Sequence, residues 1–128
     1  MPTPEYRAGV AALAADAACI SLFAAVGRRN HAEGVTLTGI ATTAWPFLTG
    51  ALVGWALSQG WRRPRAVVPT GLTVWIAAVG VGMLLRRLTG AGTPWSFVLL
   101  TAVVTGLLLL GWRTAAAGLS RRRRRSAP

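Results

Sequence analysis

The sequence is poor in every ionisable side chain except arginine. Its 128 residues include one cysteine (Cys19), one histidine (His31), three acidic residues and no lysine, so all 14 basic residues are arginine. One cysteine cannot form an intramolecular disulfide, and with one histidine it cannot build a zinc cage or a haem-attachment motif. The sequence also lacks a phosphate-binding loop and a dinucleotide-binding fingerprint. We therefore expect no metal site, no cofactor and no enzymatic activity.

Charged side chains are also too few to cover a water-facing surface. They make up 13% of the residues against 53% hydrophobic ones, with a mean hydropathy of +0.50, whereas soluble domains have about 25% charged residues. A membrane-spanning helix needs about 20 apolar residues. Four continuous runs approach this length, and they do not alternate as barrel strands do. The sequence predicts an all-α membrane protein, a four-transmembrane-helix bundle over residues 1–113, with spans at about 8–26, 35–58, 67–85 and 95–112.

The arginines are unequally divided between the two sides of the predicted bundle. Four spans place both termini on one side, where ten arginines lie (7, 62, 63, 65, 113 and 121–125), against four on the other (28, 29, 86 and 87). Positive residues are retained in the cytoplasm. We therefore expect a cell-membrane protein with cytoplasmic N- and C-termini. Tryptophans would mark the interfaces, the inner one by Trp55, Trp61 and Trp112 and the outer one by Trp95.

Residues 114–128 form an arginine-rich tail, predicted to be cytoplasmic. Five consecutive arginines repel one another and offer no apolar face, so we expect the tail to be disordered in water. It begins just after a span, and each arginine near anionic lipid contributes about 1 kcal/mol. We expect anionic lipid headgroups at the cytoplasmic face, and not nucleic acid, to contact Arg121, Arg122, Arg123, Arg124 and Arg125.

Asp16 lies in the middle of the first apolar run. Insertion of an aspartate there costs about 2.5–3.5 kcal/mol, so it should face the bundle together with Ile20, Phe23 and Gly27, which share its helical face. Because we expect no arginine at its depth, we expect a protonated carboxyl bonded to a threonine hydroxyl or to the carbonyl that Pro46 leaves unpaired. The predicted intramembrane polar site comprises Asp16, Thr42, Thr43, Trp45, Pro46 and Trp75. The alternative is a packed helix interface with a kink.

A second group of basic residues lies in the loops on the outer side. Such residues commonly extend to lipid headgroups, and the alternative is an external site for an anion or a substrate headgroup, tuned by Glu33. This predicted outer-face basic cluster consists of Arg28, Arg29, His31, Arg86 and Arg87.

Several residues across the four spans form a set, namely Asp16, Gly27-Arg28, His31, Trp45-Pro46-Phe47-Leu48, Trp75, Gly82-Met83, Arg86 and Gly111-Trp112-Arg113. This set resembles a family of small prokaryotic four-helix membrane proteins that is known only as a domain of unknown function. The resemblance covers about residues 8–113 and leaves out the tail. It implies integral-membrane placement and no particular activity.

Two functions fit these features. One is a small transporter or permease-like protein, dimeric so that it can enclose a cavity, with Asp16 in its pathway. Its four short spans and membrane acid are similar in architecture to the small multidrug-resistance transporters. The other is a non-catalytic membrane subunit or lipid-binding scaffold in a homodimer or larger membrane complex. A hydrolase built on Ser21, His31 and Asp16 is disfavoured because the last two lie about 22 Å apart along a continuous helix.

Overall fold

The chain folds into four long α-helices. A computed structural model describes residues 3–28 and 35–126, and within these residues it contains no strand. The confirmed class is therefore an all-α membrane protein. The helices are α1 (Pro4–Arg28), α2 (Leu37–Ser58), α3 (Leu72–Leu88), which follows a short π-helical turn at Val67–Gly71, and α4 (Trp95–Ser126).

All four helices are long and apolar enough to cross a membrane. They have 25, 22, 22 and 32 residues when the π-helical turn is counted with α3, against the roughly 20 that a bilayer requires. The Thr36 side chain caps the start of α2 by accepting a hydrogen bond from the Gly39 amide at 3.0 Å. At the other end, Gln59 terminates α2 in a left-handed conformation with φ of 52°.

The last helix is longer than the sequence predicted. It continues from the expected end at residue 112 to Ser126 and includes all five tail arginines. The expectation of a disordered tail is therefore wrong for the described residues. The connecting segment is rich in alanine, and both alanine and arginine favour the helix, so the helix propagates beyond the apolar run.

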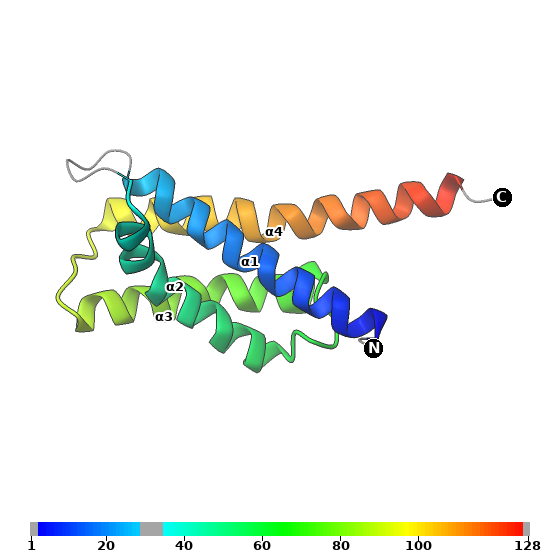
Figure 1. The fold of residues 1–128 in the computed structure, drawn as a ribbon, viewed down its shortest axis with the longest axis horizontal. Helices are drawn as coiled ribbons and strands as arrows, with labels where there is room; N and C mark the ends of the chain where they lie inside the picture. The colour runs from blue at the N-terminus through cyan, green and yellow to red at the C-terminus, as the bar shows by residue number, and fades with distance from the viewer. Residues whose placement is uncertain (1–2, 29–34, 127–128) are drawn as a thin grey trace.

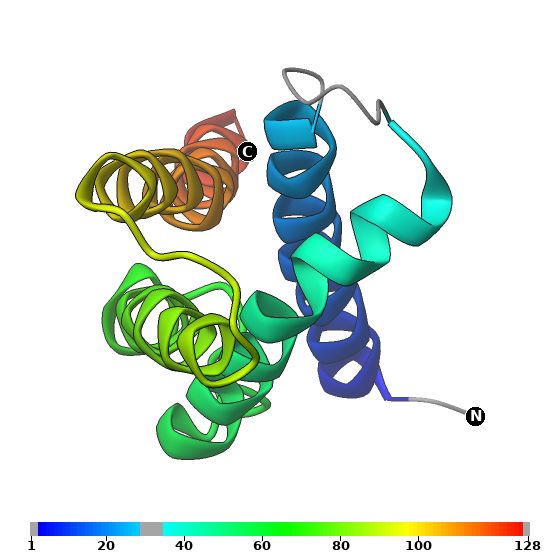
Figure 2. The same ribbon diagram turned by 90° about the vertical axis from the view of Figure 1, so that its left-hand side faces the viewer.

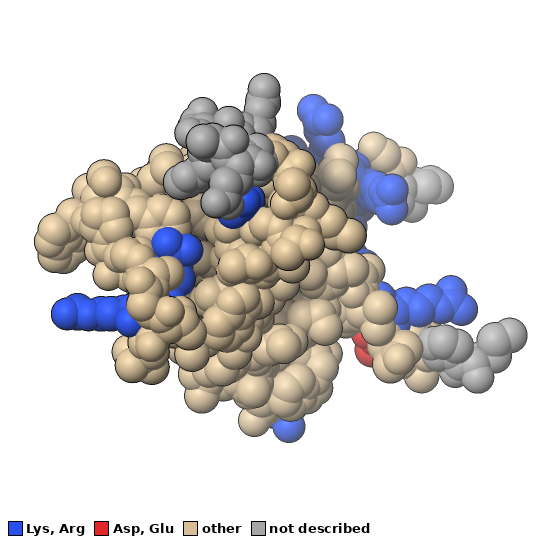
Figure 3. Space-filling view, turned by 60° about the vertical axis from the view of Figure 1, so that its left-hand side comes forward, with Lys and Arg blue, Asp and Glu red and all other residues tan. Residues whose placement is uncertain are grey.

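Helices α1, α3 and α4 run lengthwise along the molecule, whereas the first half of α2 is steeply inclined to them (Figures 1 and 2). The start of α1, the end of α4 and residues 59–66 lie at one end, which we call the tail end, whereas the end of α1, the start of α2 and residues 89–94 lie at the opposite end, which we call the far end (Figure 1). Figure 3 shows a broad uncharged surface around which separate arginine side chains are placed. This distribution suits a bundle whose sides face lipid.

Helix α2 bends and packs closely against α3. Pro46 lies inside α2, and the helix visibly changes direction along its length (Figures 1 and 2), as expected where proline removes a backbone hydrogen bond. Beyond the bend, a Cβ atom at Gly50 would lie 2.6 Å from the Ala77 carbonyl oxygen, and one at Gly54 would lie 2.6 Å from the Val74 Cα. These two glycines let the helix backbones approach.

The core near the far end is aromatic. The rings of Phe23 and Phe47 meet edge to face with centroids 5.8 Å apart, and Phe97 lies 6.4 Å from each of them. The predicted inward face of the first span is confirmed for Asp16, Ile20 and Phe23, which are buried, whereas Gly27 is only half-buried.

Candidate functional site

The Asp16 carboxylate forms a buried ion pair with Arg113 of α4. Nη1 of Arg113 donates to Oδ1 at 2.7 Å, and Nη2 donates to Oδ2 at 2.8 Å. The Asp16 side chain is 1% exposed and the Arg113 side chain is 0% exposed. Two parallel hydrogen bonds between charged groups are stronger and more specific in geometry than hydrogen bonds between neutral groups.

The indole groups of Trp55 and Trp112 also donate hydrogen bonds to the Asp16 carboxylate. The Trp55 Nε1 donates to Oδ2 at 2.8 Å, and the Trp112 Nε1 donates to Oδ1 at 2.9 Å. Each carboxylate oxygen therefore accepts two N–H groups. Four donors suit an ionised carboxylate, which only accepts hydrogen bonds. We refer to Asp16, Trp55, Trp112 and Arg113 as the Asp16–Arg113 centre.

This geometry corrects two expectations. Asp16 has a cationic partner, so the prediction that its carboxyl bonds to a threonine hydroxyl or to the carbonyl near Pro46 is wrong. Trp55 is 7% exposed, and the indole nitrogens of Trp55 and Trp112 both donate hydrogen bonds to the Asp16 carboxylate. These two side chains are therefore not simple interfacial anchors. By contrast, Trp61 and Trp95 are 57% and 82% exposed.

Arg113 also fixes the connection between α2 and α3. Its Nε donates to the Pro64 carbonyl at 3.1 Å, and Nη1 donates to the Leu109 carbonyl one turn back in α4 at 3.2 Å. The Thr70 hydroxyl donates to the Arg63 carbonyl at 2.7 Å and holds the same connection. The centre therefore joins α1, α2, α4 and the 59–66 segment at the tail end, and it closes the bundle there.

Sequence reasoning missed Arg113 because it placed that residue at the membrane interface. Residue counting places Gly106 of the fourth span at the depth of Asp16, and the Cα of Arg113 lies seven residues farther along the helix, about 10 Å. A helical side chain points back toward the helix N-terminus, and the long arginine stem bridges much of that distance. One signal was present, since Arg113 directly follows an apolar run and stands eight residues before the next arginine.

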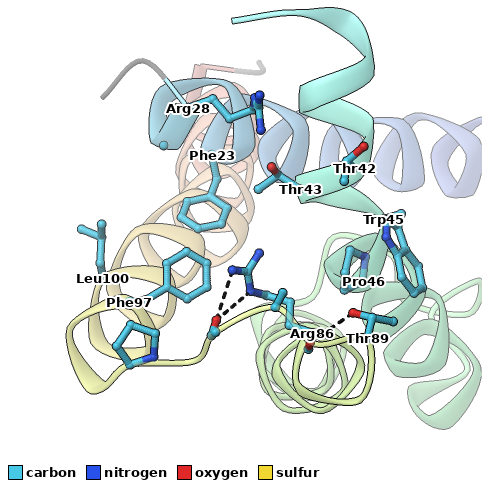
Figure 4. A pocket seen from close by; sticks show the side chains of 14 residues that line it. Phe23, Arg28, Thr42, Thr43, Trp45, Pro46, Arg86, Thr89, Phe97 and Leu100 are labelled. Carbon is cyan, nitrogen blue, oxygen red and sulfur yellow. Dashed lines mark hydrogen bonds between the residues drawn. The ribbon is translucent and has the colours of Figure 1, made fainter. Parts of the chain in front are cut away.

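A large pocket opens at the far end, among all four helices. Its volume is about 910 Å³. We call it the far-end pocket (Figure 4). It is lined by Phe23, Gly27, Arg28, Thr42, Thr43, Trp45, Pro46, Arg86, Thr89, Ala91, Gly92, Pro94, Phe97 and Leu100.

Arg86 is the best-positioned charged group in this pocket. Its Nε and Nη2 donate to the Gly92 carbonyl at 3.4 and 3.1 Å, and its guanidinium carbon lies 4.4 Å from the centre of the Phe97 ring. Nη1 makes no hydrogen bond with any residue in the part of the chain that the structure describes. In Figure 4 the end of the side chain points into the pocket.

The pocket combines parts of the two sites that the sequence predicted. Thr42, Thr43, Trp45 and Pro46 lie in it beside two residues of the predicted basic cluster, Arg28 and Arg86. The guanidinium of Arg28 also packs closely against Gly39 at the start of α2. The bend of α2 brings these residues together.

The remaining predicted site residues lie elsewhere. Asp16 is in the Asp16–Arg113 centre, and the Trp75 indole donates to the Ala102 carbonyl at 2.9 Å between α3 and α4. Arg87 lines a separate hollow beside Trp95. Arg29 and His31 lie outside the described residues. Within residues 3–28 and 35–126, no three metal-ligating side chains come together.

These features define the class of the protein as an integral-membrane four-helix bundle, closed at the tail end by an ion pair and hollowed at the far end. The chain belongs to the family described as "Protein of unknown function (DUF3054)", whose profile matches residues 13–116. This confirms the resemblance seen in the sequence. The match contains both Asp16 and Arg113 and ends before the five tail arginines. No curated protein and no solved structure matches the chain.

Proposed function

We propose that the protein is a non-catalytic membrane scaffold that holds anionic lipid at the tail end through the arginine-rich end of α4. The observation that carries this proposal is the unbroken course of α4 from the bundle through Arg121 to Arg125. The five guanidinium groups are therefore presented on the same helix that is tied to α1 by the Asp16–Arg113 centre.

The position and charge of this segment suit a membrane surface. Arg121 lies eight residues beyond Arg113, about 12 Å along the helix, which is near enough for long arginine side chains to reach headgroups. Successive residues turn by about 100°, so five arginines point around the whole helix. Helix α4 contains no acidic residue that would neutralise them. At about 1 kcal/mol each, they supply substantial attraction for anionic lipid.

The burial of Asp16 supports a scaffold in preference to a transporter that uses this carboxylate. A transporter needs the carboxylate to be reachable from water, whereas a scaffold needs it sealed and paired. Asp16 is 1% exposed and accepts four N–H groups. The arrangement stabilises a single closed form of the tail end.

Location and assembly follow as parts of the proposal. The arginine-rich tail end would face the cytoplasm in the cell membrane, because ten arginines lie on that side against four on the other. A homodimer or a larger membrane complex remains a prediction.

The test measures which lipids stay with the full-length protein. The protein is reconstituted in nanodiscs of mixed phosphatidylglycerol and phosphatidylcholine, and retained lipids are identified by native mass spectrometry. A variant with Arg121 to Arg125 replaced by glutamine should lose the excess of phosphatidylglycerol. A matched variant with lysine at these positions keeps the charge and should retain it. Equal retention by the glutamine variant would overturn the proposal.

A second measurement separates the scaffold from the transporter. Liposomes containing the parent protein are tested for uptake of a panel of cations, anions and neutral solutes, beside liposomes containing the Asp16→Asn variant. The scaffold predicts the same background uptake for both. Uptake of any solute by the parent protein above the level of protein-free liposomes would instead establish transport.

A further inference from the structure

We infer that the far-end pocket is a binding site for a phosphate-bearing amphiphile, with Arg86 contacting the phosphate and the aromatic wall contacting the chain. This site lies at the opposite end of the bundle from the tail. It is therefore independent of the lipid contacts proposed for Arg121 to Arg125.

The geometry of Arg86 favours an anion. The Gly92 carbonyl holds two of its nitrogens and Phe97 lies against the guanidinium, so the group is oriented before any ligand arrives. Orientation in advance lowers the entropy lost on binding. The third nitrogen, Nη1, faces the pocket, and a guanidinium in such a setting recognises phosphate and carboxylate oxygens.

The electrostatic surroundings agree with this assignment. The side chain of Arg28 also lines the pocket, and among the described residues the pocket wall contains no carboxylate. The Arg86 guanidinium lies in a region partly shielded from water, where charge interactions are stronger than in bulk solvent. The Thr43 side chain, also on the wall, adds a hydroxyl that can donate to an anion.

The rest of the wall favours an apolar chain attached to the anion. Phe23, Phe97 and Leu100 form its apolar side (Figure 4), and Leu100 is 55% exposed on the side of the bundle. A volume of about 910 Å³ exceeds what inorganic phosphate needs and lies within the range of small-molecule sites, about 300–1,000 Å³. Its place at the end of membrane-spanning helices matches the depth of lipid headgroups.

The test uses dodecyl phosphate as the probe. Calorimetric titration of the full-length protein in dodecyl maltoside should show saturable binding of dodecyl phosphate, weak or absent binding of inorganic phosphate, and no binding of dodecyltrimethylammonium. Inorganic phosphate binding as tightly as dodecyl phosphate would identify a free-anion site and overturn the amphiphile. Equal binding of the cationic probe would overturn the anion site.

Variants locate the binding in the pocket. Arg86→Gln should weaken dodecyl phosphate binding by about tenfold, because a hydrogen bond to a charged group is lost. Arg87→Gln is the matched control, since Arg87 lies next in sequence but outside this pocket, and it should bind normally. Equal affinities for these two variants would overturn the role of Arg86.

A filling variant keeps the test decisive if Arg86→Gln fails to fold. Gly27 lines the pocket, and a Cβ atom there would meet nothing within 4 Å. Gly27→Leu should therefore place its Cβ atom without a clash, extend its side chain into pocket space and reduce dodecyl phosphate binding severalfold. Gly9→Leu is its control, because Gly9 lies on the same helix with equally open surroundings and outside this pocket. Unchanged binding by Gly27→Leu would contradict the assigned location.

The same titrations distinguish this site from the tail site. The glutamine variant of Arg121 to Arg125 should bind dodecyl phosphate at the far-end pocket with normal affinity, and Arg86→Gln should retain phosphatidylglycerol at the tail. Loss of both activities in both variants would contradict two separate sites.

Discussion

The Asp16 carboxylate and the Arg113 guanidinium, 97 residues apart in the chain, meet at 2.7 Å in the interior of the bundle. Removing one partner leaves a buried charge without its counterion, which costs about 3–5 kcal/mol. The relationship between these two side chains therefore predicts strong coupling between their substitutions.

The first prediction concerns that coupling. Asp16→Asn and Arg113→Gln should each lower the unfolding temperature in detergent strongly, because each leaves one buried charge unpaired. The double variant should lose less than the sum of the two single losses, since it contains neither charge. Thermal unfolding followed by circular dichroism measures all three. Additive losses would show that the ion pair contributes no coupling energy.

The second prediction concerns the bend in α2. Pro46→Ala supplies the missing amide donor to the Thr42 carbonyl, and this should hold or raise the unfolding temperature. A straighter α2 would move Thr43 and Trp45 relative to Arg86, so dodecyl phosphate binding should fall. Unfolding and titration are measured on the same preparation. A variant that binds normally would show that the bend does not shape the far-end pocket.

The third prediction concerns the contact between α2 and α3. Gly50→Val should destabilise the protein, because a Cβ atom at Gly50 would lie within 3 Å of the Ala77 and Ala78 backbones. We expect a loss of about 1–3 kcal/mol, as in overpacked cores. Gly80→Val is the control, since a Cβ atom at Gly80 meets nothing within 4 Å. Comparable losses for both variants would mean that the effect comes from valine in a helix and not from the contact.

The fourth prediction concerns orientation in the membrane. A reporter fused after residue 128 should behave as cytoplasmic, and one inserted in the 89–94 segment should behave as external, because positive residues favour the cytoplasmic side. Replacing Arg121 to Arg125 by glutamine leaves five arginines on the predicted cytoplasmic side of the sequence against four on the other side, so this variant should show mixed orientation. The reverse reporter pattern in the parent protein would refute the assignment.

The helices were predictable because each apolar run exceeds what a bilayer requires, and length alone specifies a membrane span. The inward face of α1 was also predictable, since helical periodicity places Asp16, Ile20 and Phe23 together. The partner of Asp16 was not predictable from the sequence. Counting residues locates Cα atoms along a helix, whereas the ion pair depends on the reach of the Arg113 side chain.

The grouping of the pocket residues was beyond sequence reasoning for a different physical reason. Thr42, Thr43 and Arg86 become neighbours because α2 bends and rotates relative to α3, and no local pattern reports the direction of a bend. The length of α4 was likewise hidden, because the apolar run that marks a span ends before the helix does. Propensity, and not hydropathy, extends α4 to Ser126.

The position of the ion pair at the two ends of the chain has a consequence for biosynthesis. At about 5–20 residues per second, a ribosome that has made Asp16 needs roughly 5–20 s to make Arg113. During this interval the first helix carries an acidic side chain without its counterion, and insertion of that side chain costs about 2.5–3.5 kcal/mol. The charge of Asp16 in the first helix is therefore paired only after the last helix has been synthesised and inserted. Chains truncated before Arg113 would present an unneutralised carboxylate that membrane quality control can detect.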